Sequence, residues 1–153
     1  MKRLLYVCLG NICRSPTAEG VTRAILRQRG LEETIEVDSA GTGAWHVGEQ
    51  ADPRMRQAAG RRGYELTSRA RQVRSEELVE WDLVVAMDLG NLEELRGFPQ
   101  ASAVNLRLFS DFLPQGEPRD VPDPYYGGES GFDRVIDLLE RGCPRVVDSL
   151  LEE

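Results

Sequence analysis

Two uninterrupted apolar runs constrain the fold of this 153-residue chain more than any other feature. "RLLYV" at residues 3–7 and "DLVVAM" at residues 82–87 lack the alternation of a strand with one solvated face. Strands that are apolar along their length are typical of parallel sheets covered by helices on both faces. "TIEVDS" (34–39) and "SAVNLRLF" (102–109) alternate, and we expect them to complete a parallel sheet of about four strands.

Helical patterns lie between and after these runs. Ser15 followed by Pro16 predicts a helix N-cap and a first-turn proline, and Gly30 predicts the end of that helix. Further helices are expected from Asp52 to about Gly63, at "SEELVEW" (75–81), from Asp88 to just before Gly97, and from about Ser130 to Leu150 with a kink at Pro144. Alternating strands and helices predict an α/β fold, a doubly wound sheet in one domain that spans residues 1–153.

The charge balance excludes two classes of partner. The chain carries 26 acidic and 19 basic residues, a formal net charge of −7, so we expect it to bind neither nucleic acid nor a membrane surface. The N-terminal apolar run lacks the length and the cleavage site of a secretory signal. Seven arginines fall between positions 54 and 74, where they form either an ordinary solvated surface or an electropositive rim that attracts anions.

The three cysteines are Cys8, Cys13 and Cys143. An odd number without the spacing of a disulfide framework indicates free thiols and a reducing, cytoplasmic compartment. The cysteines and the lone His46 form neither a C-x₂-C nor an H-x₃-H pair, so no metal site is predicted. We interpret Cys143 and Trp81 as core residues and His46 as structural.

The segment "CLGNICRS" follows the first predicted strand directly and opens the first helix. Gly10 and Asn11 tolerate positive φ, so the segment can turn sharply. The backbone N–H groups of such a loop point at a common centre beside a helix N-terminus, which is an anion site. Arg14 can close the site with two parallel hydrogen bonds, and the same positive field favours the thiolate form of Cys8. A nucleophile and a phosphate-binding loop are therefore expected at the first strand-to-helix turn.

"CLGNICRSP", together with "VDSAGT" after the second strand and "DPYYGG" near the C-terminus, resembles the low-molecular-weight protein tyrosine phosphatases from residue 3 to the end. The resemblance implies an enzyme that hydrolyses phosphotyrosine and aryl phosphate monoesters through a phosphocysteine intermediate, without a cofactor. Its partners would be phosphotyrosine-containing proteins or small aryl phosphates, with inorganic phosphate as product and inhibitor. Cys8 would take the phosphoryl group, Arg14 would bind its equatorial oxygens, and Asp123 would protonate the leaving phenol and later activate water.

The resemblance also implies a wider set of binding and supporting residues. Those that would contact the substrate are Leu9, Gly10, Asn11, Ile12, Cys13, Ser15, Trp45 and Tyr125. Asn11 would brace the loop against Ser39, and Ser15 would both cap the helix and hydrogen-bond the Cys8 thiolate. The family often has a histidine where this chain has Ser68, so one brace behind the loop is expected to be missing.

Two roles stay open at this level. Cys13 would either form a reversible disulfide with Cys8 that protects the thiolate from over-oxidation, or remain a buried inert thiol. Tyr125 and Tyr126 would either be phosphorylated for regulation or only shape the pocket.

Three alternative functions are compatible with a phosphate-binding loop. Arsenate reductases of the same fold need a further cysteine pair, which this chain lacks between Cys13 and Cys143. Phosphoarginine phosphatases typically have threonine at the position of Ile12, whose bulk suits a flat aromatic ester better than a guanidinium. A non-enzymatic phosphate-binding module would be expected to have lost Cys8 or Asp123, and both are present.

Overall fold

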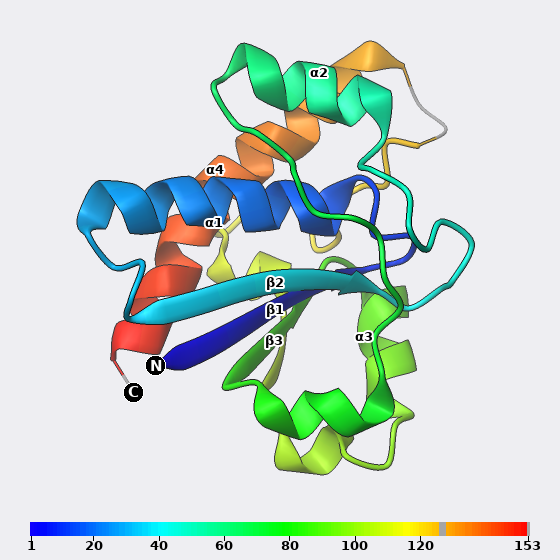
Figure 1. The fold of residues 1–153 in the computed structure, drawn as a ribbon, viewed down its shortest axis with the longest axis vertical. Coiled ribbons are helices and arrows are strands. Elements are labelled where there is room, and N and C mark those ends of the chain that lie inside the picture. The colour runs from blue at the N-terminus through cyan, green and yellow to red at the C-terminus, as the bar shows by residue number, and fades with distance from the viewer. Residues whose placement is uncertain (126–127, 153) are drawn as a thin grey trace.

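The computed structural model describes residues 1–125 and 128–152, and its centre is one parallel sheet. Within these residues the sheet contains β1 (Lys2–Cys8), β2 (Ile35–Gly41), β3 (Leu83–Ala86) and β4 (Leu106–Leu108) in the order β2-β1-β3-β4 (Figure 1). The chain passes from β1 to β2 on one side and then to β3 on the other, so the strand order reverses at β1. Ligands of open α/β sheets bind at the carboxyl ends of the strands where such a reversal occurs.

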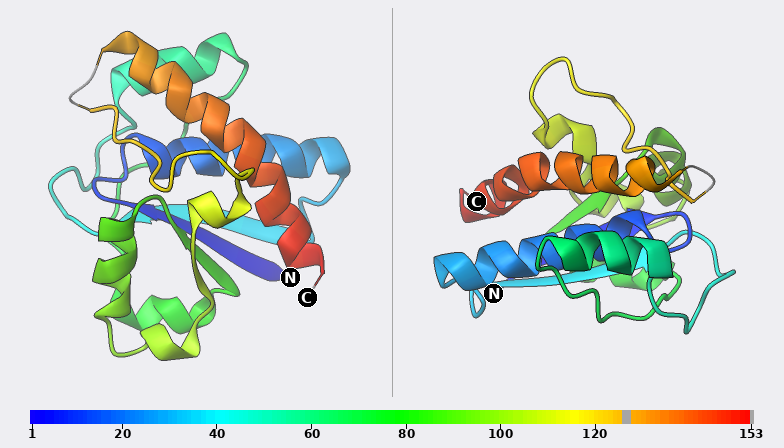
Figure 2. Two further views of the ribbon diagram at one scale, coloured as in Figure 1. Left: turned by 180° about the vertical axis from the view of Figure 1, so that it is seen from behind. Right: turned by 90° about the horizontal axis from the view of Figure 1, so that it is seen from above.

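Helices cover both faces of this sheet (Figure 2). The described α-helices are α1 (Arg14–Arg29), α2 (Pro53–Arg61), α3 (Leu89–Arg96) and α4 (Glu129–Leu151), and the 3₁₀ helices are η1 (Ser75–Glu80), η2 (Ala101–Ala103) and η3 (Phe109–Phe112). Helices α1, α2 and α4 pack on one face, whereas α3 and η1 pack on the other. The predicted α/β fold with helices on both faces is confirmed.

The central strands are buried on both sides, which explains their unbroken apolar runs. Leu4 and Tyr6 of β1 belong to the core under α1 and α4, while Leu5 and Val7 belong to the core under α3 and η1. All four side chains are fully shielded from solvent. Burying one such side chain contributes roughly 1.5–3 kcal/mol, so two-sided burial makes β1 the anchor of the sheet.

Two of the predicted helix starts are confirmed by their capping bonds. Asp52 accepts a hydrogen bond from the N–H of Arg54 at 2.8 Å at the start of α2. Asp88 accepts one from the N–H of Asn91 at 2.7 Å at the start of α3. Each cap satisfies an N–H group that has no partner inside its own helix.

The last helix, α4, continues through Pro144 without a break. Cys143 is fully buried on this helix and Trp81 is buried beside η1, as the sequence predicted. Despite the 23 residues of α4, no helix in the described ranges combines the length and apolarity needed to cross a bilayer.

Candidate active site

The loop between β1 and α1 lies at the reversal of strand order and is fixed from both sides. The N–H groups of Thr42 and Gly43, which follow β2, donate to the carbonyls of Cys8 and Leu9, each at 2.9 Å. On the other side, the Asp52 N–H donates to the carbonyl of Ile12 at 2.8 Å. The conformation of the loop is thus set by segments 30 or more residues away in the sequence.

A left-handed turn at Asn11 gives the loop its curvature. Asn11 has φ 57°, the single positive φ among the described non-glycine residues, and asparagine tolerates this region better than most residues. Gly41 packs directly against the turn: a Cβ there would lie 2.8 Å from the Leu9 carbonyl oxygen and 3.2 Å from the Asn11 nitrogen. The close approach of β2 to the loop therefore requires glycine at position 41.

Ser15 does not cap α1, and the sequence prediction of this cap was wrong. The helix begins at Arg14 with Cys13 at the N-cap position, where no side chain accepts a hydrogen bond. The Ser15 hydroxyl instead lies 3.0 Å from Cys8 Sγ and accepts the Asn11 amide at 2.8 Å, so it cannot also turn toward the helix end. Because the oxygen accepts from Asn11, its hydrogen can be donated to the sulfur.

The uncapped start of α1 leaves a set of backbone donors at the loop. Among the described residues, no backbone hydrogen bond is donated by the N–H groups of Gly10, Asn11, Ile12 or Cys13. The macrodipole of α1 adds partial positive charge at the same place. Loop N–H groups beside a helix N-terminus bind anions of phosphate size.

Arg14 is held in a single orientation beside this loop. Its Nη1 donates to Asp88 Oδ2 at 2.6 Å and to the Val121 carbonyl at 3.1 Å, and its Nη2 lies 3.4 Å from Asp123 Oδ2. Burial by itself lowers the pKa of Arg14, but Cys8, Asp88 and Asp123 outweigh it, and the pKa lies above its ordinary value. The guanidinium is a permanent cation whose fork suits an oxyanion.

The loop that carries Asp123 is tied to the end of β3. The Val121 N–H donates to the carbonyl of Met87 at 2.9 Å, immediately after the strand. Asp123 Oδ1 accepts the N–H of Tyr125 at 3.1 Å, which leaves Oδ2 on the side of Arg14. The Asp123 side chain is 36% exposed, so the carboxyl group is both oriented and open to solvent.

These groups surround a cavity of about 370 Å³. Its lining residues are Cys8, Leu9, Gly10, Ile12, Cys13, Arg14, Trp45, His46, Asp123 and Tyr125. Two residues predicted to contact the substrate, Asn11 and Ser15, are not among them and support the loop from behind, together with Ser39. A thiol, a guanidinium and a carboxyl group therefore share one cavity with largely apolar walls.

The mouth of the cavity is aromatic, and the sequence prediction missed two residues there: His46, which lines the cavity, and Arg54, which contacts Tyr125. The rings of His46 and Tyr125 lie 5.9 Å apart, and Trp45 is 73% exposed at the rim. His46, interpreted as structural, does bond to Glu49 at 2.8 Å but also lines the cavity. Arg54 donates to the Tyr125 carbonyl at 3.0 Å and lies over its ring.

The role left open for Tyr126, phosphorylation or shaping of the pocket, concerns a residue outside the described ranges.

The surroundings of Cys13 disfavour its thiolate form. Burial is the largest cause that raises the pKa of the Cys13 thiol well above its ordinary value, and the nearby Asp52, Cys8 and Asp123 raise it further. Cys8, Cys13 and Cys143 are all free thiols. No group of three or more metal-ligating side chains occurs in the described part of the chain.

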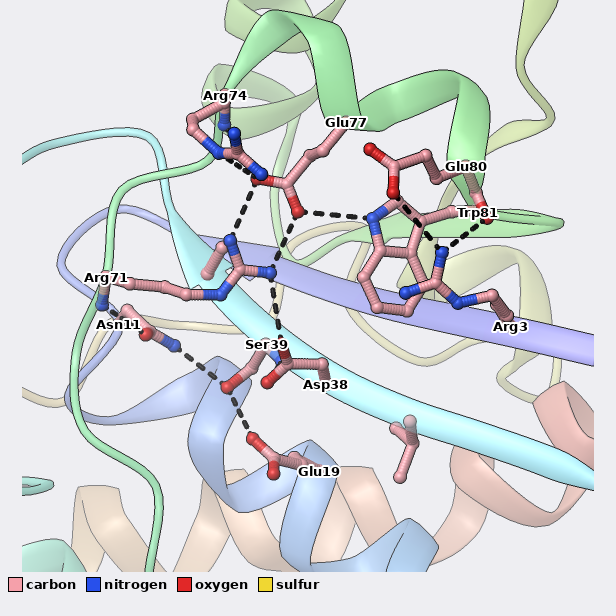
Figure 3. A network of polar contacts seen from close by, with 12 residues as sticks. Arg3, Asn11, Glu19, Asp38, Ser39, Arg71, Arg74, Glu77, Glu80 and Trp81 are labelled. Carbon is pink, nitrogen blue, oxygen red and sulfur yellow. Dashed lines mark hydrogen bonds and ion pairs between the residues drawn. The ribbon is translucent and has the colours of Figure 1, made fainter. Parts of the chain in front are cut away.

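The network behind the loop does not depend on Ser68. Asn11 Nδ2 donates to Ser39 Oγ at 3.0 Å, and Ser39 donates onward to the buried Glu19 at 2.6 Å (Figure 3). Asn11 Oδ1 accepts the backbone N–H of Arg71 at 3.0 Å. The Asn11 amide is fully engaged within the described residues, although the histidine expected from the resemblance is replaced.

Asp88, which the sequence identified only as a helix start, was also missed as a site residue. Its Oδ1 accepts the capping N–H of Asn91, while its Oδ2 accepts Arg14. One carboxylate thus fixes both α3 and the buried guanidinium.

The loop between β1 and α1 forms an anion site, and a thiol, an arginine and an acid surround the same cavity. These features define a class of protein: α/β domains that bind a phosphate group next to a cysteine. A family model described as low molecular weight phosphotyrosine protein phosphatase matches residues 3–153. The chain is 43% identical over 155 residues to a low molecular weight protein-tyrosine-phosphatase of Streptomyces coelicolor, with 99% of this chain and 94% of the relative covered. The chain belongs to this family and is a protein-tyrosine phosphatase, a hydrolase of phosphoric monoesters.

Solved structures agree with this assignment. A protein tyrosine phosphatase from Entamoeba histolytica with Hepes in its active site has a TM-score of 0.94 and 44% identity, covering 99% of this chain and 98% of that chain. A Drosophila arginine phosphatase is also similar, with a TM-score of 0.89 and 28% identity, covering 97% of each chain. Proteins named for either activity thus share this fold, and the fold alone does not identify the substrate.

Proposed function

We propose that residues 1–153 act as one catalytic domain that hydrolyses phosphotyrosine and other aryl phosphates through phosphocysteine. The observation that carries the proposal is the presence of Cys8, Arg14 and Asp123 around one cavity. In the first step Cys8 Sγ attacks phosphorus, the bond to the phenol oxygen breaks, and Asp123 donates a proton to that oxygen. In the second step water attacks the phosphocysteine, the P–S bond breaks, and the Asp123 carboxylate accepts the proton of the water.

The supporting groups divide the remaining tasks. The loop N–H groups and Arg14 hold the three non-bridging oxygens, over which the charge of the phosphoryl group is spread in each transition state. The Ser15 hydroxyl, 3.0 Å from Cys8 Sγ, stabilises the thiolate as it leaves in the second step. Inorganic phosphate is the product and, because it fits the same loop, an inhibitor.

The walls of the cavity favour an aromatic ester. Leu9, Ile12, Trp45 and Tyr125 supply apolar and aromatic surface above the thiol, where a phenyl ring would lie. Phosphotyrosine-containing proteins or small aryl phosphates are the partners that fit this chemistry. All steps use groups of the protein, so the reaction proceeds without a cofactor, and three free thiols suit a cytoplasmic enzyme.

Substrate preference is tested at Ile12, which is 7% exposed and lines the cavity. Wild type is expected to hydrolyse a phosphotyrosine peptide in EDTA in preference to a phosphoarginine peptide. Ile12→Thr should shift the ratio of the two kcat/KM values toward phosphoarginine by about tenfold, because a smaller polar wall accepts a guanidinium more readily than a ring. Steady-state kinetics on both peptides measure the ratio.

Val47→Thr is the matched control, since Val47 is an exposed apolar residue next to His46 in the sequence but does not line the cavity. It should leave the ratio unchanged. An unchanged ratio in Ile12→Thr would show that Ile12 does not select the substrate, and a wild type that prefers phosphoarginine, or that EDTA inactivates, would contradict the proposed function.

We also propose that Cys13 protects Cys8 during oxidation, because both thiols line one cavity. Peroxide would convert Cys8 to a sulfenic acid, and Cys13 would condense with it to a disulfide and water. Inactivation of wild type by hydrogen peroxide should then be reversed by dithiothreitol, whereas inactivation of Cys13→Ser should not. Cys143→Ser, which changes a thiol outside the cavity, should remain reversible, and full recovery of Cys13→Ser would exclude the protective disulfide.

A further inference from the structure

We propose that Arg71 and Glu77, which do not line the cavity, are positioning residues for the nucleophile. Their ion pair holds the backbone N–H that orients Asn11, and Asn11 in turn orients the Ser15 hydroxyl on Cys8. This inference rests on the proposed function, since it concerns the departure of the Cys8 thiolate.

The ion pair is bidentate, with Glu77 buried and Arg71 partly buried (Figure 3). Arg71 Nη1 and Nη2 lie 2.8 and 2.9 Å from the two carboxylate oxygens of Glu77, whose side chain is 4% exposed. Glu77 also accepts the N–H of Arg74 at 2.9 Å and the indole N–H of Trp81 at 3.2 Å. A third partner, Asp38, lies 3.1 Å from Arg71 Nη2, so the guanidinium has a single favourable orientation.

The carboxylate is ionised in this environment. Burial by itself raises the pKa of Glu77, but the hydrogen bonds from Arg71, from the Arg74 amide and from Trp81 outweigh it, and the pKa is lower than its ordinary value. A buried charge pair with this many donors is stable only while both partners remain.

The backbone of Arg71 forms the connection to the active-site loop. Its N–H donates to Asn11 Oδ1 at 3.0 Å, and its carbonyl accepts the N–H of Gly41 at 2.8 Å. The segment around Arg71 belongs to no helix or named strand. Backbone hydrogen bonds tie it to β2, where Val73 donates to the Gly41 carbonyl at 2.8 Å, and to the loop after β2, where Ala70 donates to the Glu49 carbonyl at 2.8 Å. These bonds hold the segment on the side of β2, and the ion pair with Glu77 holds it on the side of η1, so the direction of the Arg71 N–H depends on the ion pair as well.

Asn11 transmits this position to the sulfur. Its amide donates to Ser15 Oγ at 2.8 Å, and Ser15 Oγ lies 3.0 Å from Cys8 Sγ. If the Arg71 N–H moves away, Asn11 Oδ1 becomes a buried acceptor without a donor, and the amide reorients to satisfy it. The Ser15 hydrogen then points less directly at the sulfur, and the second step of the reaction slows.

The test is Glu77→Gln, which removes the charge and keeps the shape. We expect kcat for p-nitrophenyl phosphate to fall about tenfold, the effect of one well-made hydrogen bond lost in the transition state. Rapid mixing should show a full burst of p-nitrophenol, about one per site, because phosphorylation of Cys8 precedes the slowed step. Partial unfolding would instead lower the burst and the steady rate by the same factor.

Glu76→Gln is the matched control, because Glu76 is an exposed neighbour in the same 3₁₀ helix and undergoes the same chemical change. It should show wild-type kcat and burst. An unchanged kcat in Glu77→Gln, or a burst that falls in proportion to kcat, would overturn the positioning role.

A double-mutant cycle tests the route through Asn11. Asn11→Gly deletes the amide side chain while a glycine accepts φ 57° without strain. In that background Glu77→Gln should reduce kcat by less than about twofold, because coupled residues do not have additive effects. A further tenfold loss would mean that Glu77 acts by another path and would contradict the inference.

Arg71→Lys provides a second variant if Glu77→Gln folds poorly. Lysine keeps the charge but loses the bidentate contact, so kcat should fall by about threefold with a full burst; wild-type kcat here would equally overturn the inference. Different results would contradict the proposed function itself: a wild type without turnover, or a Cys8→Ser protein that retains it.

Discussion

The Cys8→Ser protein is expected to hydrolyse p-nitrophenyl phosphate at least about 10³-fold more slowly than the wild type. A serine hydroxyl at this position is a much weaker nucleophile than a thiolate, and it is a much poorer leaving group in the second step. The loop N–H groups and Arg14 are untouched, so phosphate should still bind with a Kd within about threefold of wild type, since its charge-assisted hydrogen bonds remain. Hydrolysis is measured in EDTA between about pH 4.5 and 8, and phosphate binding by calorimetry.

Cys143→Ser is the control for the loss of a thiol. Cys143 Sγ already accepts a hydrogen bond from the Tyr6 hydroxyl at 3.6 Å, so a serine oxygen finds a partner in the same place. This variant should keep its activity, because Cys143 does not line the cavity. Substantial turnover by Cys8→Ser would refute the phosphocysteine intermediate, and loss of phosphate binding would show instead that the loop had collapsed.

The Asp123→Asn protein should lose roughly 10²–10⁴-fold in kcat/KM, which reports the first chemical step, on esters with poor leaving groups such as phenyl phosphate, because an amide cannot donate the required proton. On p-nitrophenyl phosphate the loss should be much smaller, since that phenolate leaves without full protonation. The Asn11 network and Arg14 do not depend on the Asp123 proton, so the burst on the activated ester should survive. Kinetics on a series of substituted phenyl phosphates measure the difference.

Asp120→Asn is the matched control in the same loop. Asp120 accepts the N–H of Leu89 at 3.0 Å and does not line the cavity, and an asparagine oxygen can accept the same bond. Its kcat/KM on each ester should match that of the wild type. Equal losses on activated and unactivated esters in Asp123→Asn would argue against a general acid at this position.

The strands and most helices follow from local patterns in the sequence. The runs that become β1 and β3 are apolar throughout because each faces two cores, and Asp52 and Asp88 precede helices because their carboxylates cap them. The strand predicted at residues 102–109 forms over only Leu106–Leu108, since part of that pattern belongs to η2. The helix predicted at residues 75–81 forms as the 3₁₀ helix η1, a type of helix that occurs mostly in short segments such as this one.

Partners that are distant in the sequence could not be predicted in this way. Ser15 has the residue type of a cap, but three-dimensional proximity to Cys8 and Asn11 decides its hydrogen bonds. Asp88 and Glu77 are two among 26 acidic residues, and nothing in their neighbourhoods marks the contacts with Arg14 and Arg71. Arg71 fits neither expectation for the arginine-rich segment, because its partly buried guanidinium is paired with Glu77 and Asp38 and does not line the cavity.

The left-handed turn at Asn11 is held by hydrogen bonds to Ser15 and from Arg71. A loop that the surrounding fold holds in this way loses less conformational entropy when an anion binds than an unsupported loop would. Affinity for phosphate therefore depends on the rigidity of the surrounding fold. The contacts of Asn11 with Ser39 and Arg71 both stabilise the folded loop and keep it in the shape that binds the anion. A change that loosens this corner of the sheet weakens anion binding at temperatures at which the rest of the protein is still folded.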